Sequence, residues 1–179
     1  YPFAHSIICQ TPKAAAFFKY HKNRQIIPNP LPTPPSSYPD NKDFTPPQPF
    51  IAGLGRLGHE KGFDRLIAAF AKIKNKHPNH HLVILGEGDQ RAALESQINA
   101  LDLNERVHLP GQKKQPFSIL KDAELFVIPS RFEGFPNALC EAMAHALPVI
   151  ATQNATQSVS VFRHEDNMLI TQGNDSDAV

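Results

Sequence analysis

The sequence has few cysteines, little net charge, no long apolar run and no signal peptide. Its two cysteines, Cys9 and Cys140, lie far apart without metal-binding or redox spacing, so we expect a reducing compartment. Eighteen basic and seventeen acidic side chains give a net charge of +1, which offers no argument for nucleic acid as a partner. No apolar stretch approaches the roughly 18 to 20 residues of a membrane-spanning helix. We therefore predict a cytoplasmic location.

The chain also lacks an initiating methionine, so we expect it to be a fragment of a longer protein. Residues 5–9 and 25–27 have the composition of short strands. Thr11-Pro12 predicts the start of a helix that continues to about Tyr20. Two strands and one helix are too few to bury a core, so residues 1–27 are interpreted as the end of another domain.

Residues 28–49 form a proline-rich segment. Nine of its 22 residues are proline, mixed with serine, aspartate and asparagine. Proline fixes φ, removes a backbone donor and favours stiff, extended chain. We interpret the segment as a linker without chemistry of its own, which makes residues 50–179 a second domain.

After the linker, strand-like apolar runs alternate with helix-like segments. Strands are predicted at residues 50–52, 81–85, 106–109, 124–128 and 148–151. Helices are predicted at residues 63–73, 91–101, 117–120 and 136–146. This alternation predicts an α/β fold with a doubly wound parallel sheet.

A glycine-rich loop follows the first strand of this domain. Gly53, Gly55 and Gly58 have the spacing of a dinucleotide-binding fingerprint. In that fingerprint the helix opens at the glycines and an acidic residue follows about 20 positions later. Here the helix is predicted only from Phe63, and residues 76–78 contain no acid.

Two cations, Arg56 and Lys61, lie among these glycines. Glycine lets a ligand approach the backbone closely, and a guanidinium and an ammonium both suit the oxygens of a diphosphate. The loop is therefore a candidate diphosphate site. A surface turn with solvated charges is the alternative interpretation.

The segment from Leu125 to Ala151 predicts a strand, a polar loop, a helix and a second strand. The loop contains Glu133 and Gly134, and the helix is predicted to start at Pro136, since proline is tolerated in a first helical turn. The N-terminus of this helix points at the carboxyl end of a strand, where open α/β sheets bind ligands and where anions are favoured.

The same helix is predicted to have two faces. By spacings of four and three, the core face contains Leu139, Met143 and Ala146. A more polar stripe contains Asn137, Glu141 and His145. Spacing alone leaves open that Glu141 is an exposed helical glutamate and that Glu133 only favours the positive end of the helix.

Two motifs resemble those of one enzyme family. Glu133 and Glu141 are separated by seven residues within EGFPNALCEAMAHALPVIA, which resembles the E-x7-E signature of retaining glycosyltransferases of family 4. The loop GRLGHEKG resembles the family's G-R-x(4)-K-G element. These enzymes have the two-domain GT-B fold. The resemblance therefore implies that residues 50–179 are the Rossmann-like, donor-binding C-terminal half. Residues 1–27 then resemble the last strand, helix and strand of the acceptor domain.

The resemblance also implies roles for single residues. The implied catalytic residues are Arg56 and Lys61, which would hold the donor's diphosphate, and Glu133, which would lie against the donor sugar. Glu141 would bind the ribose hydroxyls, and residues 109–112 would lie at the base. The remaining donor-binding residues are Gly55 and those whose backbone N–H groups would face the phosphates: Gly134, Phe135, Asn137, Ala138 and Leu139.

The chemistry implied by the resemblance is sugar transfer with retention of anomeric configuration. Departure of a diphosphate requires stabilisation of negative charge, which two cations and a helix N-terminus can supply without a metal. No Asp-x-Asp pair stands at a strand end, so neither a metal nor another cofactor is expected. The implied partners are a nucleotide-diphosphate sugar, with UDP as the expected nucleotide, and a glycan or lipid-linked acceptor.

The acceptor-activating groups are expected on the missing part of the N-terminal domain. We therefore expect this fragment to be inactive alone, and any peripheral contact with the inner membrane face to come through that domain. The resemblance weakens after Ala151, because the segment 152–160 lacks the family's glycine pair and no donor contact is predicted for it. A strand is predicted at residues 167–170, and the chain is expected to end before the helices that close a GT-B domain.

Two other functions fit part of the pattern. One is an NAD-type dinucleotide-binding domain, because the glycine spacing matches. The other is an interaction module that keeps the fold without catalytic activity.

Overall fold

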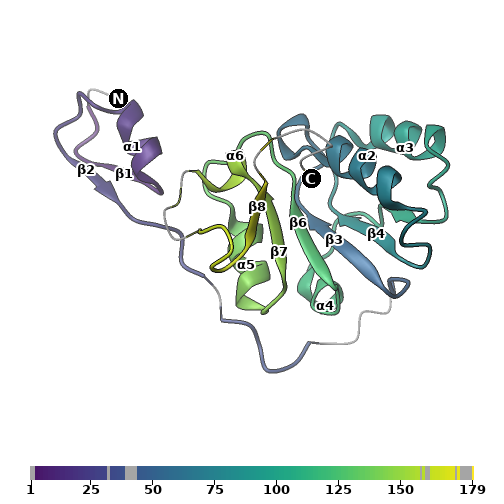
Figure 1. Ribbon diagram of the computed structural model, residues 1–179. Coiled ribbons are helices and arrows are strands. Elements are labelled where there is room, and N and C mark those ends of the chain that lie inside the picture. The colour runs from purple at the N-terminus through teal and green to yellow at the C-terminus, as the bar shows by residue number, and fades with distance from the viewer. Residues whose placement is uncertain are drawn as a thin grey trace.

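The computed structural model describes residues 3–31, 33–38, 44–157, 159, 162–171, 173 and 179. Within them the chain forms a two-stranded and a six-stranded sheet, both parallel (Figure 1). The small sheet and one helix lie at one end of the molecule (Figure 1).

The N-terminal unit consists of β1 (Ile7–Cys9), α1 (Pro12–Phe17) and β2 (Arg24–Ile26). Thr11 caps α1 as predicted, because its hydroxyl accepts a hydrogen bond from the Ala14 N–H at 3.1 Å. The helix ends at Phe17, before the predicted end at Tyr20. Ile8, Phe17 and Tyr20 are exposed, which fits the expectation that three short elements cannot enclose a core.

The large sheet confirms the predicted doubly wound architecture. Its strands are β3 (Phe50–Leu54), β4 (His81–Leu85), β5 (Val107–His108), β6 (Leu125–Ile128), β7 (Val149–Thr152) and β8 (Leu169–Thr171). The spatial order is β5-β4-β3-β6-β7-β8. Counted from β3, this is the order 3-2-1-4-5-6 of dinucleotide-binding folds.

Helices cover both faces of this sheet. They are α2 (Phe63–Ile73), α3 (Arg91–Ala100), α4 (Phe117–Leu120), α5 (Asn137–Ala144) and α6 (Gln153–Thr156), with a 3-10 turn, η1 (His59–Lys61). Phe63 and Phe70 of α2 and Leu94 of α3 belong to one apolar core. Phe117 of α4 and Leu139 of α5 belong to the core on the other face.

The predicted core face of α5 is partly wrong. Leu139 is fully buried and Met143 is half-buried, but Ala146 is exposed and lies beyond the helix in a left-handed turn with φ of 57°. The other buried positions are Cys140 and Ala142, and Ala146 cannot belong to a helical face because the helix ends at Ala144. The helix also starts one residue later than predicted, with Pro136 as its N-cap.

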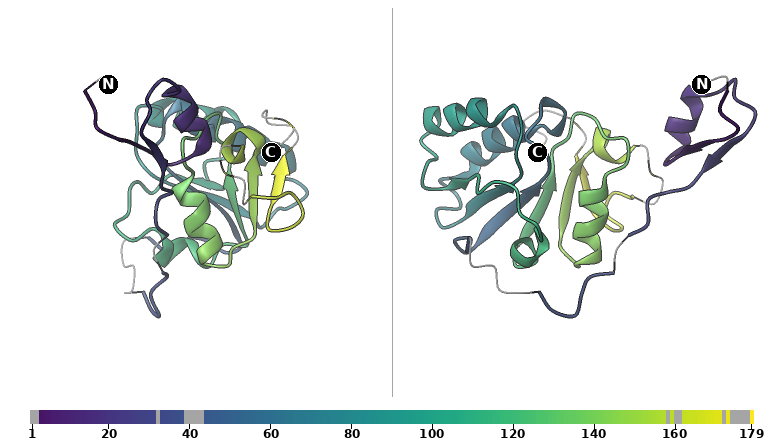
Figure 2. Two further views of the ribbon diagram at one scale, coloured as in Figure 1. Left: turned by 90° about the vertical axis from the view of Figure 1, so that its left-hand side faces the viewer. Right: turned by 180° about the vertical axis from the view of Figure 1, so that it is seen from behind.

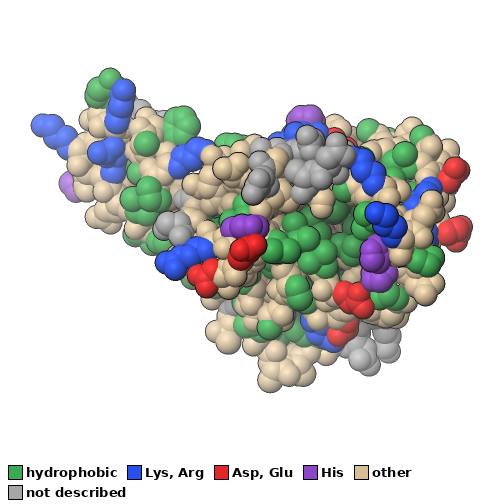
Figure 3. Space-filling view, viewed as in Figure 1, with side chains coloured by type: hydrophobic (Ala, Val, Ile, Leu, Met, Phe, Trp, Pro, Cys, Tyr) green, Lys and Arg blue, Asp and Glu red, His purple; other side chains and the backbone are tan. Residues whose placement is uncertain are grey.

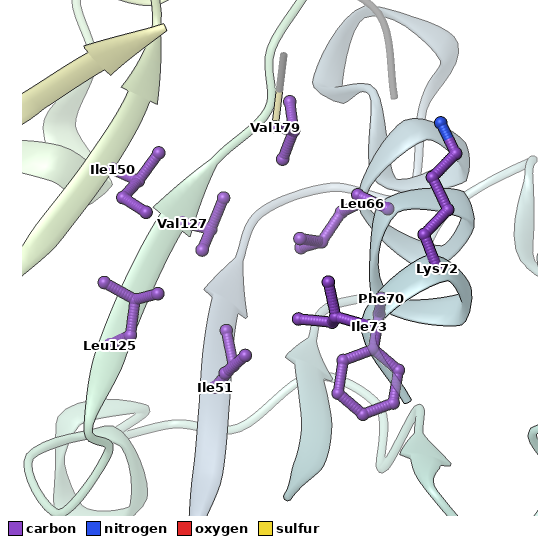
Figure 4. Close-up of a pocket in the computed structure, with 10 residues that line it drawn as sticks. Ile51, Leu66, Phe70, Lys72, Ile73, Leu125, Val127, Ile150 and Val179 are labelled. Carbon is purple, nitrogen blue, oxygen red and sulfur yellow. The ribbon is translucent and has the colours of Figure 1, made fainter. Parts of the chain in front are cut away.

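An apolar groove runs beside α2 over the sheet. Apolar side chains gather at the centre of this face of the molecule (Figure 3). The groove has a volume of about 300 Å³, and Ile51, Leu125 and Val127 from the sheet face Leu66 and Ile73 from α2 (Figure 4). Helix α2 therefore covers only part of this face of the sheet, and the part beside the helix is apolar.

The segment between β2 and β3 contacts α5 at both ends of that helix. The Asn29 side-chain amide donates to Asn137 Oδ1 at 2.8 Å, at the start of α5. The Tyr38 hydroxyl forms a hydrogen bond with Nε2 of His145, the C-cap residue. The His145 ring also stacks on Phe117, with ring centroids 4.2 Å apart. Figure 2 shows the segment passing beside α5 in both views.

Candidate functional site

The strand order places a crevice between β3 and β6. The chain leaves β3 toward β4 on one side and reaches β7 from β6 on the other side, so the order reverses between these neighbours. Ligands of open α/β sheets bind at the carboxyl ends of the strands at such a point. The loops that leave β3 and β6 are residues 55–62 and 129–136, which contain most of the predicted site residues.

The loop after β3 is held against the end of β4. The Gly55 N–H donates to Leu85 O at 3.0 Å, and the Leu57 N–H donates to Glu87 O at 2.9 Å. A Cβ on Gly86 would lie 1.8 Å from Gly55 O, so this approach requires glycine. The loop then forms η1, and α2 begins only at Phe63, as predicted. The helix therefore does not open at the fingerprint glycines.

Lys61 and Glu133 meet across the crevice. Lys61 Nζ donates to Glu133 Oε1 at 2.7 Å, and the Ser130 hydroxyl donates to the same oxygen at 2.8 Å. The side chain of Lys61 is 25% exposed and that of Glu133 is 9% exposed. Thr152, buried at the end of β7, donates from its hydroxyl to Ser130 O at 2.6 Å. A carboxylate and an ammonium thus lie side by side where β3, β6 and β7 end.

Arg56 points to a different partner. Its Nε and Nη2 donate to Glu60 Oε1 at 3.2 and 2.8 Å, and its side chain is 64% exposed. Arg56 and Gly55 line a pocket of about 490 Å³ at the carboxyl ends of β3 and β4. Gln112 and Lys113, from the segment after β5, line the opposite part of this pocket. Its size is within the range of small-molecule sites.

The wall of this pocket is fixed by Arg91. Its Nε and Nη2 donate to the Glu87 carboxylate at 2.7 and 2.6 Å, and Nη1 and Nη2 each donate to Leu109 O at 3.3 Å. Arg91 therefore ties the loop after β4 to the loop after β5. Glu87 is the acidic side chain at the end of β4, and its bidentate ion pair with Arg91 already occupies both of its oxygens.

The predicted phosphate donors at α5 are only partly available. The Asn137 N–H donates to Phe135 O at 3.0 Å, and the Leu139 N–H donates to Pro136 O at 3.1 Å. An anion would compete with these bonds. A Cβ on Gly134 would meet nothing within 4 Å, so the loop surface is open at this point. Ala138 follows in the first turn and is half-buried.

Glu141 lies on the next turn of α5. Burial raises the pKa of its carboxyl, and the charge of His145 offsets this only in part. Burial thus disfavours the ionised form of the Glu141 carboxyl. Glu141 lies within α5, whereas Glu133 lies in the loop before this helix and pairs with Lys61.

Sequence reasoning did not single out Ser130, Thr152 or Arg91. Ser130 and Thr152 are polar side chains at or just beyond a strand end, and this position was the available signal, whereas Arg91 is the first residue of α3 and its ion pair with Glu87 at i and i+4 was the signal. None of the helices in the described residues combines the length and apolar character needed to cross a bilayer. In that same part of the chain, no three His, Cys, Asp or Glu side chains are grouped to hold a metal ion.

The fold and site define a class of protein. A six-stranded parallel sheet of this order, with a lysine, an arginine and a carboxylate at its switch point, is typical of α/β domains that bind phosphate-bearing ligands. A family model described as glycosyl transferases group 1 matches residues 37–179. The chain belongs to this family.

Known proteins agree with this assignment. An uncharacterized glycosyltransferase of Methanocaldococcus jannaschii is 37% identical over 181 residues, which cover 94% of this chain and 44% of that protein. N-acetylgalactosamine-N,N'-diacetylbacillosaminyl-diphospho-undecaprenol 4-alpha-N-acetylgalactosaminyltransferase of Campylobacter jejuni is 34% identical, over 69% of this chain and 33% of that protein. The crystal structure of HepE from Anabaena in complex with UDP and glucose superposes with a TM-score of 0.80 at 21% identity. The superposed region covers 99% of this chain and 52% of the HepE chain.

The chain thus spans less than half the length of the first of these relatives. Membership of the family supports the glycosyltransferase prediction over the NAD-type alternative, because the whole second domain lies within the match.

Proposed function

We propose that this chain is the donor-binding half of a retaining glycosyltransferase of family 4, with UDP-sugar as donor. In this proposal residues 50–179 bind the nucleotide-sugar, residues 28–49 are the linker, and residues 1–27 are the end of the acceptor domain. The observation that carries it is the contact between Lys61 and Glu133, which unites the two family-like motifs at the switch point. The complex of HepE with UDP and glucose supports UDP as the nucleotide.

The reaction breaks the bond between the anomeric carbon and the β-phosphate oxygen. The bonding electrons pass to that oxygen, so the diphosphate gains negative charge and the sugar gains positive character. The acceptor hydroxyl oxygen then bonds to the anomeric carbon from the same face, and its proton passes to the departing phosphate oxygen. Transfer is fast only if the charge on the diphosphate is stabilised as it develops.

Lys61 and Arg56 supply that stabilisation in this proposal. The Lys61 side chain lies over Gly55, within 3.5 to 3.6 Å of where a Cβ would be, so it extends along the loop toward the crevice. Arg56 is exposed at the rim of the 490 Å³ pocket and exchanges Glu60 for phosphate oxygens when a ligand binds. Two cations at a diphosphate make metal assistance unnecessary, so we propose no metal and no other cofactor.

Glu133 and Glu141 position the donor at its two ends. Glu133, held by Lys61 and Ser130, lies against the sugar, and Glu141 accepts hydrogen bonds from the ribose hydroxyls. The backbone N–H groups of Gly134, Phe135 and Ala138, with those of Asn137 and Leu139 after rearrangement of their present bonds, face the phosphates. The base lies in the pocket beside Gln112.

The acceptor is a glycan or a lipid-linked sugar. The name of the Campylobacter jejuni relative specifies a diphospho-undecaprenol acceptor, which supports the lipid-linked class. The groups that activate the acceptor belong to the N-terminal domain, so this chain alone transfers no sugar. A cytoplasmic location with peripheral contact at the inner membrane face fits an acceptor of this kind.

Calorimetric titration with UDP tests the site. The wild-type chain is expected to bind UDP, and Arg56→Ala and Lys61→Ala each weaken binding by about 10- to 100-fold, the value of a hydrogen bond to a charged group. Lys121→Ala is the control, because Lys121 pairs with Asp122 on the surface. Equal affinity of all four proteins, or no binding to wild type, would refute the phosphate assignment.

Two further measurements separate the alternatives. Tighter binding of NADH than of UDP-sugars would restore the dinucleotide alternative. In the full-length protein, a Glu133→Ala variant with wild-type transferase activity would show that this site is not catalytic, and a protein without any transferase activity would favour the interaction module.

A further inference from the structure

Arg131, in the loop after β6, is bonded to the loop after β3 at several points. Its backbone N–H donates to Glu60 O at 2.9 Å. Its Nη1 donates to His59 O at 2.9 Å and to Asp64 Oδ1 at 2.6 Å, and its Nη2 donates to Asp64 Oδ2 at 2.5 Å. Arg131 therefore joins one side of the crevice to the other by main chain and side chain together.

The ion pair with Asp64 has the geometry of a strong contact. Two parallel N–H···O bonds from one guanidinium fix both distance and orientation. Asp64 is the second residue of α2, where a negative charge is favoured by the helix dipole. Burial alone would raise the pKa of the Asp64 carboxyl, but the hydrogen bonds and charge of Arg131 outweigh this and lower it. The Arg131 side chain is only 20% exposed.

The backbones of the two loops also touch beside this pair. Gly62 has φ of 69°, and a Cβ at this position would lie 2.2 Å from Pro129 O. Only glycine fits, because both the left-handed conformation and the space exclude a side chain. Gly62 directly follows Lys61, and Pro129 lies shortly before Glu133. The contact therefore brings together the backbone segments that contain Lys61 and Glu133.

We propose that Arg131 and Asp64 are a positioning pair that holds Lys61 beside Glu133. The inference rests on the proposed function, in which these two side chains meet the diphosphate and the sugar. Neither Arg131 nor Asp64 touches the ligand. They act by fixing the separation of two loops that come from strands far apart in sequence, and an error of about 1 Å in such a separation is enough to impair a site.

Amide hydrogen exchange in the absence of nucleotide tests whether Arg131 and Asp64 hold the two loops together, which we call the tether. Arg131→Ala and Asp64→Asn are expected to speed exchange of the amides at positions 131 and 132, whose N–H groups donate to Glu60 O, while amides of β3 and β4 keep their wild-type rates. Arg163→Ala is the matched control, since Arg163 pairs with Asp166 at an exposed site outside the crevice. Wild-type exchange at positions 131 and 132 in both variants would overturn the tether.

A double-mutant cycle on UDP affinity tests the positioning role. Arg131→Ala is expected to weaken UDP binding about tenfold in the wild-type background, and less than about twofold in Lys61→Ala, because the residue it positions is then absent. Arg131→Lys keeps the positive charge but not the planar guanidinium with its two parallel donors. This variant is expected to recover part of the UDP affinity that Arg131→Ala loses. A merely structural Arg131 would give equal losses in both backgrounds, and that result would overturn the proposal.

The two measurements also separate this inference from the proposed function. If wild type binds no UDP, the function fails, and donor positioning fails with it. The exchange experiment still decides whether Arg131 and Asp64 hold the two loops together.

Discussion

Replacement of Lys61 by methionine removes the charged ammonium group and keeps a linear apolar side chain that is one atom shorter. It removes the ammonium beside Glu133, whose side chain is 9% exposed, while the Ser130 hydroxyl still donates to this carboxylate. Exposed ion pairs contribute about 0 to 1 kcal/mol, and removal of one partner from a fully buried pair costs about 3 to 5 kcal/mol. Because Lys61 is 25% exposed, we place the loss for Lys61→Met between these limits, at about 2 kcal/mol.

The reciprocal change should cost less. In Glu133→Gln the amide oxygen still accepts from Ser130, and Lys61 can turn toward solvent, so we expect about 0.5 to 1 kcal/mol. Thermal unfolding measures both losses. At about 2 to 4 °C per kcal/mol for a chain of this size, Lys61→Met lowers Tm by about 4 to 8 °C.

The matched control is Lys121→Met. Lys121 and Asp122 are 42% and 56% exposed, so this variant should unfold within about 0.5 kcal/mol of wild type. The reasoning is refuted if Glu133→Gln is as destabilising as Lys61→Met, or if Lys61→Met and Lys121→Met unfold together. The first result would mean that Lys61 cannot turn toward solvent when Glu133 loses its charge, and the second would mean that the pair is solvated in solution.

Two other variants test neighbouring features. Since burial raises the pKa of Glu141, its contribution to stability is present below the unfolded pKa, near about 4.3, and is lost as pH rises through the folded value. Glu141→Gln should therefore have a higher Tm than wild type at pH 7 and the same Tm near pH 4. The variant should also bind UDP about tenfold more weakly. Equal Tm values of variant and wild type at pH 7 would contradict the stability prediction. Gly62→Ala should lower the free energy of unfolding in urea by more than about 2 kcal/mol, because its Cβ would lie 2.2 Å from Pro129 O. In Gly134→Ala the new Cβ would have nothing within 4 Å, so its free energy of unfolding should stay within about 0.5 kcal/mol of wild type. Similar losses in both variants would argue against the close contact at Gly62.

The elements of the sheet domain could be predicted largely from the sequence. The strand at 81–85 and the helices at 63–73 and 117–120 have the predicted bounds: the strand is a continuous apolar run, and the apolar residues of the longer helix recur at spacings of three and four. The face of α5 could not, because the spacing of Leu139, Met143 and Ala146 presumes a helix longer than the one that forms. The helix ends at Ala144, and Ala146 turns outward.

The sequence predicted single candidate residues of the site but neither their arrangement nor the supporting side chains Ser130, Thr152 and Arg91. Sequence motifs selected Lys61 and Glu133 separately, and the contact between them spans 72 positions in the chain. It exists because β3 and β6 are neighbours, and an alternating pattern of strands and helices does not specify which strands are neighbours. The same applies to the ion pair of Arg131 with Asp64. The predicted roles of the site residues stay predictions until ligands are tested.

The contacts of Asn29 and Tyr38 with α5 make the segment after β2 a mechanical connection. Asn29 lies three positions after the end of β2 and is bonded to the first residue of α5. Any displacement of the N-terminal unit would therefore act on the start of α5 before it could reach β3, which comes later along the chain. The second attachment, at Tyr38 and His145, secures the chain again before it enters the sheet. The N-terminal unit is thus connected to the large sheet through both ends of α5, the helix that borders the proposed phosphate site.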